Sequence, residues 1–162
     1  MSGEPQLAVV AEQTGDAPPQ VGIVMGSQSD MDTMQGAAKE LADRGIAHEI
    51  QVISAHRQPE ELAEYARTAR ARGLRVVIAG AGLSAALPGA VAAHSDLPVI
   101  GVPLSSRLSA AGGLDAILSI VQMPPGVPVA AVGLDNARNA GILAARIIDS
   151  ASPPGGRPTA VA

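Results

Sequence analysis

The sequence of 162 residues contains no cysteine, no tryptophan and no phenylalanine, and it has a single tyrosine. A chain without cysteine has no disulfide, no thiolate metal site and no cysteine nucleophile. One aromatic ring offers no platform for stacked bases, and a net charge of −4 offers no basic surface to nucleic-acid phosphates. The composition therefore predicts no nucleic-acid partner, and a hydrophobic core built from Val, Ile, Leu, Ala and Met.

Long apolar runs are also missing, because no stretch reaches the roughly 18 residues that a membrane-spanning helix needs. Residues 1–20 lack the basic segment and apolar run of a signal peptide. We therefore expect a cytoplasmic protein that does not enter a membrane. The polar segment 1–19 is predicted to be a flexible leader, 20–150 a single domain, and the Pro- and Gly-rich 151–162 a flexible tail.

The domain alternates short apolar runs with segments of helical periodicity. This alternation predicts one three-layer α/β domain with a parallel sheet, and such folds bind ligands at the carboxyl ends of their strands. The predicted strands are 21–25, 47–53, 74–79, 97–102 and 127–132, and the predicted helices are 31–45, 59–72, 83–94, 114–122 and 136–150.

The first predicted strand ends at Gly26, and Ser27, Ser29 and Asp30 follow just before a predicted helix. Serine and aspartate are preferred N-cap residues, and glycine permits a tight turn with close backbone approach. A helix N-terminus favours an anion such as a phosphate, because its N–H groups are unpaired and it is partially positive. An ordinary capped turn remains the alternative for this segment taken alone.

The second predicted strand ends in Ser54, Ala55, His56 and Arg57. Arginine binds phosphate or carboxylate in a bidentate way, and histidine can act as a general acid or base near neutral pH. The alternative is a surface histidine and arginine at the start of a helix.

The third predicted strand is followed by a glycine loop, Gly80-Ala81-Gly82, in which small residues would let the backbone approach a small ligand. A tight turn between strand and helix is again the alternative. Three scattered histidines without cysteine provide no spaced pair of metal ligands, so no metal is predicted.

Five segments in one order resemble the PurE family, which comprises N5-carboxyaminoimidazole ribonucleotide mutase and the related aminoimidazole ribonucleotide carboxylase. The resemblance covers about residues 20–150, and five motifs in register are far more specific than any single one. The segments are GSQSD (26–30), SAHR (54–57), GAG…LPG (80–89), LPVIGVP (97–103) and GLDAILSIVQMPPGVPVA (113–130).

The resemblance implies a flavodoxin-like fold, assembly as a homo-octamer, and an isomerase that works without metal or organic cofactor. Its reaction would interconvert N5-carboxyaminoimidazole ribonucleotide and 4-carboxyaminoimidazole ribonucleotide by CO2 transfer in de novo purine biosynthesis. His56 would be the general acid and base. The substrate would be bound by Gly26, Ser27, Ser29, Asp30, Ser54, Ala55, Arg57, Gly80, Ala81, Gly82, Ala86 and Leu87.

The chain departs from the family pattern at several positions. The family's second active-site histidine is Ala86 here, and Arg107, in a loop about two residues longer than in some relatives, is a candidate replacement. The family element near 135–140 is altered to LDNARNA (134–140). These departures leave two alternatives open: a diverged decarboxylase or carboxylase for another ribonucleotide or heteroaromatic acid, and a non-catalytic nucleotide-binding or scaffold protein.

An oligomer is also expected from the residues themselves. Apolar helices such as 137–148, in a small domain almost without aromatic residues, are predicted to bury their faces between subunits.

Overall fold

The computed structural model of the chain describes residues 10–13 and 17–151. Within these residues one sheet has the strand order β1-β3-β2-β4-β5-β6. Strand β1 is antiparallel to β3, and all other neighbouring strands are parallel. The strands are β1 (Val10–Gln13), β2 (Val21–Met25), β3 (His48–Val52), β4 (Val76–Gly82), β5 (Val99–Leu104) and β6 (Ala130–Ala131).

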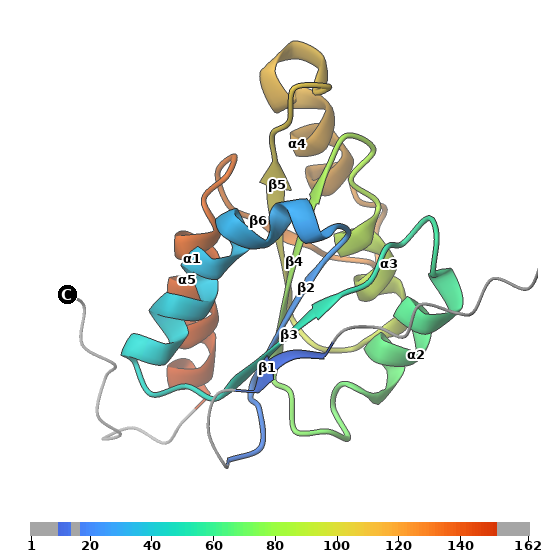
Figure 1. Cartoon of the computed structure of the whole chain (residues 1–162). Helices are drawn as coiled ribbons and strands as arrows, with labels where there is room; N and C mark the ends of the chain where they lie inside the picture. Colours follow the sequence, from blue (N-terminus) through green and yellow to red (C-terminus); the bar gives the residue numbers. More distant parts are fainter. Residues whose placement is uncertain (1–9, 14–16, 152–162) are drawn as a thin grey trace, which may run out of the picture.

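Helices cover both faces of the sheet and complete the three layers (Figure 1). Helices α1 and α5 pack on one face, and α2, α3 and α4 pack on the other. The helices are α1 (Met31–Asp43), α2 (Pro59–Thr68), α3 (Leu87–His94), α4 (Leu114–Val121) and α5 (Ala137–Ser150), with short 3₁₀ helices η1 (Gln28–Asp30) and η2 (Ala110–Gly113).

The predicted α/β fold with a parallel sheet is confirmed, and the order of the five parallel strands is that of flavodoxin-like proteins. Several local predictions are wrong. Gly80-Ala81-Gly82 is the end of strand β4 and not a loop, residues 83–86 are irregular and not helical, and residues 10–13 of the predicted leader form β1. Of the predicted strand 127–132 only Ala130–Ala131 is a strand, and the helix predicted to reach residue 72 ends at Thr68. Segments 1–9, 14–16 and 152–162 of the predicted leader and tail lie outside the described residues.

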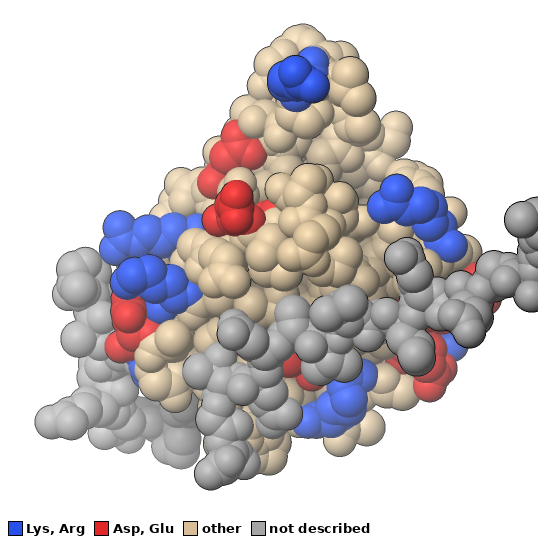
Figure 2. All heavy atoms as spheres, viewed as in Figure 1, with Lys and Arg blue, Asp and Glu red and all other residues tan. Residues whose placement is uncertain are grey.

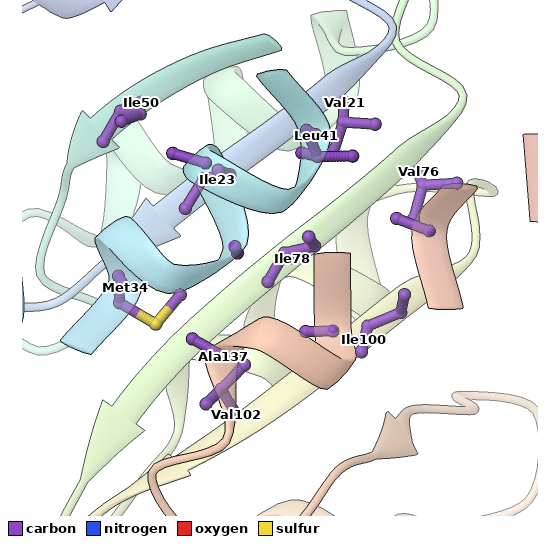
Figure 3. Close-up of a cluster of buried hydrophobic side chains, with 14 of the residues drawn as sticks. Val21, Ile23, Met34, Leu41, Ile50, Val76, Ile78, Ile100, Val102 and Ala137 are labelled. Carbon is purple, nitrogen blue, oxygen red and sulfur yellow. The ribbon is translucent and has the colours of Figure 1, made fainter. Parts of the chain in front are cut away.

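The core on the α1–α5 face consists of aliphatic side chains, as the composition predicts. Val21 and Ile23 on β2, with Ile78 on β4, are fully buried beneath these helices. Figure 3 shows Met34 of α1 lying over the strands near Val102. The flexible thioether of methionine fills irregular space that an aromatic ring occupies in other cores.

Helices α1 and α5 pack closely because their facing residues are small. A Cβ added at Gly141 of α5 would lie 2.9 Å from the carbonyl oxygen of Ala37 in α1. One ion-paired group also joins the helices: Glu40 of α1 accepts hydrogen bonds from Arg138 Nε of α5 (2.9 Å) and Arg44 Nη2 (2.6 Å). The hydrogen bond from Arg138, followed by that from Arg44, lowers the pKa of the Glu40 carboxyl.

The single tyrosine, Tyr65, lies in the core on the opposite face of the sheet. Its ring is buried between α2 and β2, and the Arg72 guanidinium stands 4.6 Å above the ring centroid. Arg72 also pairs with Glu49 of β3 at 2.9 Å. Burial raises the pKa of the Tyr65 phenol far above its usual range.

In the described part of the chain, no helix combines the length and the apolar character that crossing a membrane requires.

Two glycines in the α1–α5 interface give opposite predictions. Gly141→Ala should lower the free energy of unfolding by about 1–3 kcal/mol, because the new methyl group meets backbone that cannot move aside. Gly36→Ala is the matched control, since its Cβ makes only ordinary contacts, 3.5 Å or more, with α5. The helical preference for alanine over glycine should stabilise that variant by up to about 1 kcal/mol. Urea unfolding would measure both, and two changes of the same sign would contradict the prediction.

Candidate active site

Four neighbouring strands, β3, β2, β4 and β5, end at the same edge of the sheet, and a cavity of about 380 Å³ lies there. This is the edge at which ligands bind in open parallel sheets. The cavity is lined by Gly26, Ser27, Ser29, Asp30, Ser54, His56, Arg57, Gly82, Leu83, Leu104, Ser105, Ser106 and Leu108.

The loop after β2 brings hydroxyl groups to the start of a helix. Ser27 is the N-cap of η1, which continues directly into α1. The Ser27 Oγ accepts hydrogen bonds from the backbone N–H of Ser29 (3.3 Å) and from its hydroxyl (2.9 Å). The loop therefore presents two serine hydroxyls at a helix N-terminus, where an anion is favoured.

The loop after β3 places Arg57 and His56 at the mouth of the same cavity, and both are exposed. The buried Ser54 anchors this loop, because its Oγ accepts the backbone N–H of Arg57 at 3.3 Å. One guanidinium nitrogen of Arg57 donates to the carbonyl oxygen of Gly26 at 3.0 Å, which ties the two loops together. The other nitrogens of this group have no hydrogen-bond acceptor within the described residues, so they are available to an anion.

The end of β4 contributes Gly82 and Leu83 to the cavity. A Cβ at Gly82 would lie 2.8 Å from the backbone oxygen of Leu104, so glycine allows β4 and β5 to approach closely here. Leu83 adopts a left-handed φ of 56°, which costs a branched side chain about 1–2 kcal/mol. Such strain at the edge of a cavity is typical of functional sites.

The other predicted binding residues do not line this cavity. Gly80 faces Met34 in the core, while Ala81 and Leu87 are buried in the opposite core. Ala55 packs against that same core from the half-buried position between Ser54 and His56. Ala86 is the exposed residue that precedes α3.

The cavity residues that follow β5 were not predicted from the sequence. Leu104, Ser105, Ser106 and Leu108 line the cavity, whereas the exposed Arg107 between them does not. The signal that could have identified them is position, because the carboxyl end of a fourth parallel strand must reach the same edge of the sheet. The serines and leucines themselves have no distinctive spacing.

One acidic group of the cavity has a shifted pKa. Partial burial raises the pKa of the Asp30 carboxyl, while hydrogen bonds from Ser27 and Ser29 lower it by less. A desolvated carboxylate beside a serine loop is ready to accept hydrogen bonds from hydroxyl groups of a ligand.

The cavity therefore has a polar side and an apolar side. Ser27, Ser29 and Arg57 form a site suited to a phosphate, and His56 provides the titratable imidazole. Leu83, Leu104 and Leu108 provide the apolar side. On the face in Figure 2, the Lys and Arg side chains form separate small groups and no continuous basic surface. The arrangement fits a small phosphorylated molecule that also has an apolar part.

Fold and site together define a flavodoxin-like α/β protein with a polar cavity at the carboxyl edge of its sheet. The AIR carboxylase family model matches residues 20–154. The N5-carboxyaminoimidazole ribonucleotide mutase of Pyrococcus abyssi is 58% identical over 83% of this chain and 76% of its own length. The mutase of Mycobacterium tuberculosis is 56% identical over the same shares.

A solved structure gives the same result. The crystal structure of Treponema denticola PurE superposes with a TM-score of 0.72 at 35% identity, covering 83% of this chain and 82% of that one. The chain belongs to the AIR carboxylase family, and the predicted resemblance to PurE is confirmed.

The raised pKa of Asp30 predicts that this residue lowers stability at neutral pH. A folded-state pKa above the unfolded value means that ionisation favours the unfolded chain. Asp30→Asn should therefore raise the free energy of unfolding at pH 7.5, and the gain should vanish at pH 3, where the carboxyl is protonated in both states. Asp32→Asn is the control, because Asp32 is exposed in the first turn of α1. Denaturant titrations at the two pH values would test this, and a gain that persists at pH 3 would contradict it.

Proposed function

We propose that the protein interconverts N5-carboxyaminoimidazole ribonucleotide and 4-carboxyaminoimidazole ribonucleotide by CO2 transfer, as an isomerase of de novo purine biosynthesis. The observation that carries the proposal is the position of His56 beside a serine- and arginine-lined anion site, in a chain more than half identical to enzymes named for this reaction. A binding module has no need of an exposed imidazole at that position.

The phosphate of the ribonucleotide would be held by the hydroxyls of Ser27 and Ser29 and by the guanidinium of Arg57. The link from Arg57 to the Gly26 carbonyl keeps the guanidinium oriented before the substrate arrives. Asp30 would accept hydrogen bonds from the ribose hydroxyls. Held at this end, the nucleotide presents its imidazole ring to His56 and to the leucines of the cavity.

His56 would transfer the protons in both half-reactions. When the N5–carboxylate bond breaks, CO2 leaves and N5 takes up one proton. When C4 attacks the CO2, a C–C bond forms and C4 loses one proton. A single imidazole that donates the first proton and accepts the second returns to its starting state, which is general acid–base catalysis by one group.

Between these steps the CO2 must stay beside C4. The side chains of Leu83, Leu104 and Leu108 cannot form hydrogen bonds with water. They therefore favour retention of the apolar CO2 at that side of the cavity. The aminoimidazole is itself a good carbon nucleophile, so the chain's contribution is to position the ring and exclude water. The reaction as proposed uses no metal or organic cofactor.

We also propose that copies of the chain form a homo-oligomer, with the octamer as the expected assembly. Within one copy, the buried side chains of α5 pack on α1 and on the sheet. A different helix, α4, carries an apolar stripe on its outer face, because Leu114, Leu118 and Val121 are each nearly half exposed. A second copy is the partner that covers such a stripe most simply.

The oligomer proposal is tested by a charge placed on this stripe. Leu118→Glu should reduce the mass measured by light scattering from that of an oligomer to that of smaller species, because a buried unpaired charge is costly. Gln35→Glu, on the exposed side of α1, adds the same charge and should leave the mass unchanged. A monomeric wild-type protein, or an unchanged mass for Leu118→Glu, would refute the role of α4.

The proposed reaction is tested with N5-carboxyaminoimidazole ribonucleotide as the substrate. His56→Asn should reduce kcat by about 10²–10⁴-fold, the usual contribution of a general acid–base group, with little change in nucleotide affinity. His94→Asn, at the exposed end of α3 and away from the cavity, is the matched control and should keep full activity.

The assay also separates the alternative functions. If the wild-type protein binds the nucleotide without turnover, a decarboxylase or carboxylase that acts on a different ribonucleotide is indicated. The reason to consider this alternative is Ala86, which stands where the resemblance implies a second histidine. Equal activity in the wild type and in His56→Asn would remove His56 from the mechanism. The cytoplasmic location and the lack of a nucleic-acid partner stay predictions.

A further inference from the structure

Among the residues that the structure describes, the cavity wall formed after β5 by Ser105, Ser106 and Leu108 makes few hydrogen bonds to other elements. Within this loop, Ser106 and Ser109 bond to each other, and the Ser106 hydroxyl accepts the backbone N–H of Leu108. At its far end, Asp115 accepts the N–H of Ala110 at 3.0 Å. These hydrogen bonds lie within the loop or join its far end to α4, and none of them involves Ser105 at its start.

Asp135 supplies that attachment from the segment between β6 and α5. Its Oδ1 accepts the backbone N–H of Ser105 at 2.8 Å, and its Oδ2 accepts the Ser105 hydroxyl at 2.6 Å. Its own N–H donates to the carbonyl oxygen of Pro103 at 2.8 Å. Asp135 thus makes three hydrogen bonds to Ser105 and Pro103, the residues on either side of Leu104. Leu104 ends β5 and lines the cavity.

The carboxylate is not needed for the local turn. Asp135 has a left-handed φ of 56°, which Asn adopts as readily as Asp and Gly adopts without strain. The cap of α5 is made by the next residue, since the Asn136 side chain accepts the N–H of Asn139 at 3.1 Å. Both carboxylate oxygens point instead to Ser105, and hydrogen bonds to an ionised acceptor are the strong ones.

We propose that Asp135 is a positioning residue of the active site, which fixes Ser105 and, through it, Ser106 and Leu108 of the cavity wall against the bound ribonucleotide. Asp135 lies in the altered element LDNARNA, and it does not itself line the cavity. The inference rests on the proposed function, because the wall matters only if the cavity holds the substrate.

A series at position 135 separates the carboxylate from the backbone conformation. Asp135→Gly keeps the left-handed turn without strain and removes both acceptors, so it should raise KM about tenfold, within the range of small misplacements, with kcat changed less than threefold. Asp135→Asn keeps the turn and the acceptor for the Ser105 N–H, so its KM should stay within about threefold of the wild-type KM. A merely structural role would lower the folded fraction, and therefore the apparent kcat, at unchanged KM.

Two further measurements complete the test. Asp96→Gly is the control, because this exposed aspartate pairs with Arg70 away from the cavity, and its KM should not change. Ser105→Ala and Asp135→Gly should be non-additive in KM, since both remove the hydrogen bond between the Ser105 hydroxyl and Asp135 Oδ2. Amide hydrogen exchange at Ser105 should be faster in Asp135→Gly than in wild type, whatever the substrate is.

The outcomes distinguish this inference from the proposed function. An active wild type with an unchanged KM in Asp135→Gly overturns the role of Asp135 alone. A wild type without turnover overturns the proposed reaction, and Asp135 is then judged by calorimetric binding of 4-carboxyaminoimidazole ribonucleotide, which should weaken about tenfold in Asp135→Gly. A wild type that neither reacts with nor binds these nucleotides overturns both proposals.

Discussion

The central position of β2 in the sheet decides where the polar groups of the cavity lie. After β2 the chain adds β3 on one side, and then β4 and β5 on the other. The loops on either side of this reversal diverge, one passing to each face of the sheet, and a crevice opens between them. Gly26 therefore stands beside both the Arg57 loop and the end of β4, and the hydrogen bond from Arg57 to the Gly26 carbonyl is a direct result.

The second constraint is the absence of aromatic side chains from most of the core. Small residues such as Gly141 let α5 approach α1 at backbone contact distance, and Met34 fills the space above β4 and β5. The buried carboxylate of Glu40 is paired with Arg44, which is also buried, and with Arg138, whose side chain is largely exposed. The start of α5 is fixed in this way, and with it the short segment that carries Asp135.

Most of the fold could be predicted from the sequence, because short apolar runs, helical periodicity and glycines at the ends of helices are local signals. The loops after the first two strands could also be predicted, since serines, histidine and arginine at strand ends have a specific chemistry. Gly80 and Ala81 were mistaken for a loop because small residues also suit a strand that packs tightly against a neighbour. Ser105 and Leu108 had no local signal, as their place in the cavity follows only from the order of the strands.

Tyr65 gives this protein an unusual optical property. It is the single tyrosine in a chain without tryptophan, so all near-ultraviolet emission comes from one buried phenol beneath the Arg72 guanidinium. The fluorescence signal of Tyr65 therefore reports on the contact between α2 and β2. No second fluorophore overlaps with it. An imidazole nucleotide that binds at the far edge of the sheet can be followed in its own absorption band with little protein background.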